Sequence, residues 1–128
     1  MKDTFHTNRA VAACAPAVIT AAADGPVIDL DGFDSALVVV NTGAVVGDGD
    51  FGVKLQESDQ PASGFGDVAA ADQLGAFPAT LEASSVYRVG YIGSKRKRYI
   101  RLAITKGGGT SIALGAVAVL GHPSRAPV

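Results

Sequence analysis

Turn-forming residues divide this chain into short segments along its whole length, which favours strands and turns over long helices. Glycine accounts for 16 of the 128 residues. Clusters such as Asp31-Gly32, Gly47-Asp48-Gly49-Asp50 and Gly107-Gly108-Gly109 are typical of tight turns. No stretch of ~12 residues has the 3.6-residue apolar period of an amphipathic helix. We therefore expect a fold made of short strands.

Seven segments between the turns have the length and pattern of strands. In the segment that follows Asp50, for example, Val53 and Leu55 alternate with the polar Lys54 and Gln56, as in a strand with one buried face. The predicted strands are Ala17–Ala22, Val27–Leu30, Ser35–Asn41, Gly52–Ser58, Val86–Ile92, Arg98–Thr105 and Ile112–Leu120.

Three segments carry more particular signals. Ile112–Leu120 is apolar throughout, so we expect both of its faces to be covered, as in a central strand or in one that lies under a partner. Asp67–Gly75 suits one or two helical turns with Asp67 as the cap. Leu81–Ser85 suits an edge strand.

Strands at a spacing of roughly 10–15 residues, joined by turns, predict an all-β fold. We expect a single compact antiparallel β-sandwich or barrel, jelly-roll-like, with extended N- and C-terminal arms. The expected division is an N-terminal arm over residues 1–16, the sandwich over 17–121 and a C-terminal tail over 122–128. Each end is interpreted either as frayed or as an arm that orders on assembly.

Composition and spacing argue against several classes of function. Cys14 is the single cysteine, and His6 and His122 lie near opposite ends of the sequence. This argues against a disulfide and against a cysteine or multi-histidine metal site. The net charge of −1 is not that of a nucleic-acid binder. We expect a non-enzymatic protein with no cofactor, metal, small-molecule substrate or nucleic-acid partner.

Two apolar stretches have some features of export or membrane signals. Ala10–Ala23 has the composition of a signal-peptide core, but Asp3 precedes it and Pro16 interrupts it. Ile112–Gly121 is too short to cross a bilayer as a helix, which takes ~20 residues. We expect synthesis in a reducing cytoplasm and no membrane partner.

Basic residues concentrate around one predicted hairpin tip. Six of the 11 lysines and arginines fall within the 14 positions from Arg88 to Arg101. One interpretation is a solvated tip that discourages edge pairing; the other is a docking patch for an acidic protein surface. The candidate interaction residues are Arg88, Tyr91, Lys95, Arg96, Lys97, Arg98, Tyr99 and Arg101.

Several segments, in order and spacing, resemble a family of small tailed-bacteriophage proteins encoded among the virion structural genes. The resemblance covers most of the chain from about Ala17 onward. It departs from the family at Asp59-Gln60-Pro61, where an Asp-Asp-Gly turn is usual, and at the more basic Lys95-Arg96-Lys97 tip. The similar segments are 28–37, 54–59, 67–68, 87–93, 98–102 and 121–128.

The resemblance implies a structural role in the virion, as a capsid decoration (cement) protein or minor capsid protein on the capsid surface. The implied partners are the major capsid protein and other copies of the chain, in a symmetric trimer or, alternatively, a dimer. Two other functions stay open: a head–tail joining or tail-associated subunit, and a carbohydrate-binding β-sandwich module. The absence of tryptophan argues against the last.

Overall fold

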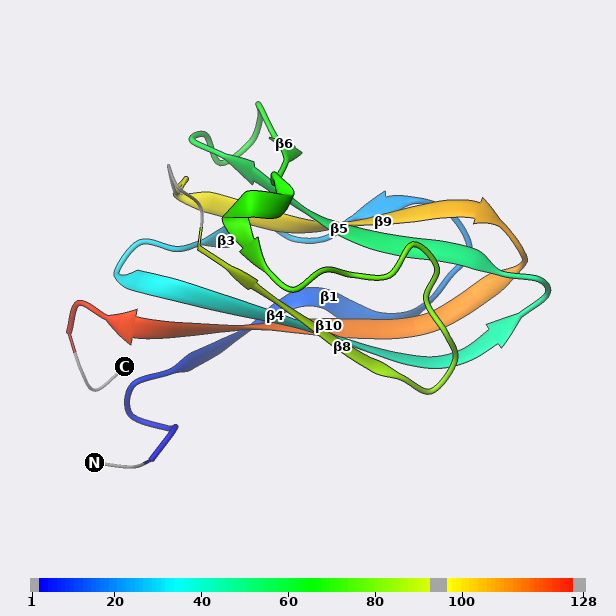
Figure 1. The fold of residues 1–128 in the computed structure, drawn as a ribbon, viewed down its shortest axis with the longest axis horizontal. Coiled ribbons are helices and arrows are strands. Elements are labelled where there is room, and N and C mark those ends of the chain that lie inside the picture. The colour runs from blue at the N-terminus through cyan, green and yellow to red at the C-terminus, as the bar shows by residue number, and fades with distance from the viewer. Residues whose placement is uncertain (1–2, 93–96, 126–128) are drawn as a thin grey trace.

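The computed structural model describes residues 3–92 and 97–125. Two antiparallel sheets pack face to face (Figure 1). Sheet A has the order β1 (Arg9–Ile19), β10 (Ser111–Pro123), β4 (Phe33–Val46), β8 (Val86–Tyr91) and β7 (Gln73–Leu74). Sheet B has the order β2 (Ala23–Asp24), β9 (Tyr99–Gly108), β5 (Asp50–Ser58) and β6 (Gly66–Asp67), and β3 (Ile28–Asp29) also pairs with β9. The predicted all-β sandwich is confirmed.

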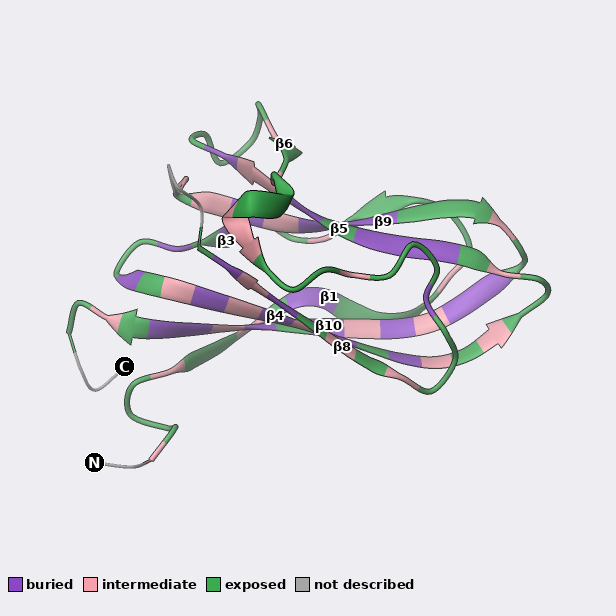
Figure 2. Cartoon of the chain, in the orientation of Figure 1, coloured by how far each residue is buried: buried purple, intermediate pink, exposed green. Residues whose placement is uncertain are grey.

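The core lies between the sheets and follows the two-residue period of the strands. Val53 and Leu55 point inward from β5, as predicted, and Ile100 and Leu102 do so from β9. Buried positions alternate with exposed ones along much of the long strands, and the short 3-10 helix η1 (Ala70–Asp72) lies outside the core (Figure 2). The inward faces of all the long strands therefore form one apolar layer.

The first strand begins earlier than the sequence indicated. Residues 9–16, expected in an arm, belong to β1, which pairs with β10 from Arg9↔Leu120 to Ile19↔Ile112. Ala13 and Cys14 are buried by this pairing. Alanines are poor strand formers and Pro16 breaks a strand pattern, but β1 is an edge strand with two bulges, where proline is tolerated.

Two other expectations are wrong in detail. Of Asp67–Gly75, only Ala70–Asp72 is helical, and its cap residue Ala69 makes no side-chain cap bond. Leu81–Ser85 is not an edge strand. It is part of a connection that closes one side of the sandwich, because the N–H of Leu81 donates to the Phe51 carbonyl of sheet B and the N–H of Ser84 donates to the Gly43 carbonyl of sheet A.

The described parts of both terminal segments lie at one end of the sandwich (Figure 1). His122 and Pro123, expected in the tail, belong to β10. The N–H of Ser124 donates to the Gly32 carbonyl at 2.8 Å, and Ser35 Oγ lies 2.8 Å from His122 Nδ1. The β3–β4 turn and the starts of β1 and β9 are at this end as well, which is called the terminal end below. The helix in the described ranges is too short to span a membrane.

Two hairpin turns meet at the opposite end, and they leave no room for a side chain. Gly109 has φ 89°, and a Cβ there would collide with the backbone of Gly49. A Cβ on the preceding Gly108 would meet open space. Gly109→Ala should therefore lower the free energy of unfolding by ~1–3 kcal/mol, whereas Gly108→Ala should change it by less than ~1 kcal/mol. Urea-induced unfolding of both variants measures this, and equal stability of the two would contradict it.

Candidate interaction surfaces

The structure does not bring the predicted basic residues together on one surface. Arg88 is exposed on the outer face of sheet A, and Arg101 lies on the outer face of sheet B. Tyr91 is buried between the sheets. Lys95 and Arg96 lie outside the described residues. The described members therefore do not share one surface.

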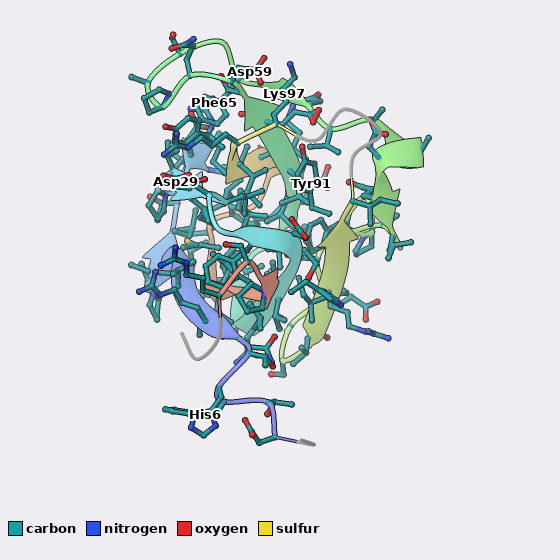
Figure 3. All side chains as sticks on the ribbon, turned by 90° about the vertical axis from the view of Figure 1, so that its left-hand side faces the viewer. His6, Asp29, Asp59, Phe65, Tyr91 and Lys97 are labelled. Carbon is teal, nitrogen blue, oxygen red and sulfur yellow. The ribbon has the colours of Figure 1, made fainter. Side chains whose placement is uncertain are left out.

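Arg98 and Lys97 are paired with carboxylates at the terminal end. The guanidinium of Arg98 donates to both carboxylate oxygens of Asp29 at 2.9 Å and lies 3.8 Å from Asp31. Its hydrogen bonds lower the pKa of Asp29 and raise that of Arg98 itself. Lys97 Nζ lies 3.0 Å from Asp59 (Figure 3). These two cations are matched by acidic neighbours.

Tyr91 joins the two sheets from inside the core. Its hydroxyl donates to Glu57 of β5 at 2.8 Å and accepts the backbone N–H of Lys97 at 3.0 Å. The side chain is 1% exposed. Tyr91 therefore has a structural role. The other predicted tyrosine, Tyr99, lies under the guanidinium of Arg98, whose Cζ is 5.2 Å from the ring centroid.

Arg101 belongs to a polar network that covers the outer face of sheet B. Its Nε donates to Gln56 at 2.8 Å, its Nη2 lies 3.5 Å from Asp24, and its guanidinium lies 4.3 Å from the Phe65 ring centroid. Gln56 and Lys54 in turn donate to Asp67, and these bonds lower the pKa of Asp67. These bonds link the polar side chains on the outer face of sheet B to one another.

A hollow of about 410 Å³ opens at the terminal end. Sequence patterns singled out Lys97 and Arg98 but not the β3–β4 turn, which contributes most of the wall. Two carboxylates and two cations are among its lining residues, so it suits a polar protein surface of mixed charge. The terminal hollow is lined by Leu30, Asp31, Gly32, Phe33, Asp34, Lys97, Arg98 and Ser124.

The outer face of sheet A is apolar and uncovered. Within the described residues, Ile112–Leu120 is covered on its inner face only, because Val117 is 45% exposed on the outer one, and cover of that face by a partner stays a prediction. A shallow groove of about 730 Å³ runs along it. By strand register, the outward positions, called the apolar face below, are Ala10, Ala12, Val18, Leu37, Val39, Asn41, Val86, Arg88, Gly90, Ala113, Gly115, Val117 and Val119.

The described residues contain no cluster that resembles a metal centre. Within 3–92 and 97–125, no three His, Cys, Asp or Glu side chains come together as ligands would. Cys14 is buried, and burial raises the pKa of its thiol, which keeps it protonated at neutral pH.

The sequence matches no model of a known protein family. It also has no significant match among curated proteins. The resemblance to phage structural proteins therefore stays a prediction.

Arg98→Gln should raise the pKa of Asp29 toward its ordinary value of ~3.9, because the largest cause of its depression is the Arg98 hydrogen bond. A lowered folded-state pKa stabilises the fold above the ordinary pKa, and that stabilisation disappears as the pH falls through the lowered value. The wild type should thus be more stable than the variant at neutral pH, and their free energies of unfolding should converge in acid. Carboxyl-carbon NMR titration measures the pKa, with Arg101→Gln as the control. An unchanged Asp29 pKa in Arg98→Gln would contradict the assignment.

Proposed function

We propose that this chain is a non-enzymatic structural subunit of a tailed-bacteriophage virion, a decoration protein on the outside of the capsid. The proposal is supported by the resemblance of six ordered segments to phage virion proteins. The compact sandwich agrees with it, since a decoration protein needs a stable scaffold with contact surfaces and no reaction centre.

One observation carries the proposal: a single small sandwich has two separate surfaces suited to contact. The terminal hollow is charged and lies at the end that holds both terminal segments. The apolar face lies on the side of sheet A. A subunit that attaches to a lattice and also contacts its neighbours needs two such surfaces.

The terminal hollow is the surface we assign to the capsid. Charged rims position and select a partner more than they bind it strongly, and the described residues of both terminal segments lie at the same end, where they can add contacts. The capsid surface opposite should carry both signs of charge, because Asp31 and Asp34 stand beside Lys97 and Arg98 around the hollow.

The number of copies in purified particles tests the proposal. A decoration protein should be present in hundreds of copies per head. About a dozen copies would instead indicate a head–tail joining or tail-associated subunit, and absence from the particle would overturn a virion role.

Asp34→Arg should weaken binding to undecorated heads at least ~10-fold, because it reverses a charge at the rim of the terminal hollow. Asp48→Arg makes the same change in an exposed turn at the opposite end of the sandwich and should bind as the wild type does. Bound copies are counted after adding each folded variant to heads at ~0.1 M salt. Equal binding of the two variants would remove the terminal hollow from the capsid interface.

A further inference from the structure

We propose that the apolar face of sheet A binds the same face of a second copy of this chain, which gives a two-fold symmetric dimer. The dimer does not depend on the capsid role proposed above, since it concerns the other contact surface of the sandwich.

The chemistry of the two outer faces is the first reason. On sheet B, the outward side chains of Lys54, Gln56 and Arg101 are bonded to carboxylate, amide and aromatic neighbours. On sheet A, the outward positions carry valine, alanine, glycine and leucine, apart from Asn41 and Arg88, and Val18 and Val86 are about two-thirds exposed, at 66% and 67%. Soluble monomers rarely expose a contiguous apolar patch larger than a few hundred Å². Another surface should therefore cover sheet A.

The size of the face matches a second sheet. The four long strands of sheet A have 11, 13, 14 and 6 residues. At ~3.4 Å per residue and ~4.8 Å between strands, the whole outer side of these strands, with the apolar face in its middle, covers ~700 Å². A standard stable interface buries ~800 Å² per partner. Two copies that pack along the full length of these strands, as sheets pack in a sandwich, would come close to that size.

The register of the face places large side chains at one end and small ones at the other. Val39 and Val117 are register partners, as are Leu37 and Val119. Farther along β10, toward Ser111, the outward positions are Gly115, which lies beside Pro16, and Ala113. A two-fold axis that runs across the strands, between Val117 and Gly115, lays Val117 of each copy over Gly115 of the other.

The charge of the face also favours a second copy over a charged partner. Arg88 is the one charged residue of the apolar face, and it is on β8, the outermost of the four long strands. Its long side chain can reach solvent at the rim of the interface. A strongly acidic partner could pair with one cation only. A second copy of the apolar face offers matching apolar side chains at the other positions apart from Asn41.

Val117→Lys tests the dimer, because it places a charge in the middle of the apolar face. Wild type should sediment as a dimer at micromolar concentration, and Val117→Lys should raise the dissociation constant at least 100-fold. Thr105→Lys adds the same charge to an exposed position on the outer face of sheet B and should dimerise as the wild type does. Asp34→Arg should also stay dimeric, which separates this result from the capsid experiment.

A second measurement applies if Val117→Lys fails to fold. In a Cys14→Ala background, Val117→Cys should be joined to its copy by a short bis-maleimide, since the two positions flank the axis. Thr105→Cys should not be joined. A wild type that is monomeric at several hundred micromolar, a trimer, or equal cross-linking at positions 117 and 105 would each overturn the proposal. The proposal would also be overturned if the wild type stayed monomeric in solution and required Val117 only for binding to heads.

Discussion

The pairing of β4 with β10 is the constraint on which the rest of the structure depends. It places Val38 and Ala118 in the core and Val39 and Val117 on the outside, and a slip of one residue would exchange the two sets. β1 and β8 pair with these strands and take their register from them. The same ladder thus determines both the core and the composition of the outer face.

The sequence predicts strands well where only one side of a strand is apolar. Val53 and Leu55 alternate with polar neighbours, and both the strand and its inner face were correct. Along Ile112–Leu120 both sides are apolar, so the pattern identifies a strand but not its inner face. Which face points inward is decided by contacts between residues that are distant in sequence, such as Gly115 against Pro16 and Ser35 beside His122. The sequence also failed to predict residues 9–16 of β1, because the alanines there are held in a strand by pairing with β10 rather than by their own propensity.

The candidate site shows why a run of like charges in a sequence is weak support for a charged surface. Lys97 and Arg98 are neighbours in the chain, but their carboxylate partners are 38 and 69 residues away, at Asp59 and Asp29. Alternation along a strand then sends Tyr91 inward and leaves Arg88 outside. The apolar face, in contrast, is assembled from four strands, of which only β10 was predicted from its sequence to be apolar on both sides.

The position of β10 also governs the order in which the molecule can form. β10 follows every other strand in the chain, yet it sits between β1 and β4 in sheet A. During synthesis β1 has to wait, unpaired, for a partner made about a hundred residues later. In that interval the inner faces of β1 and β4 lack their neighbour, and this is when the chain is most prone to aggregate.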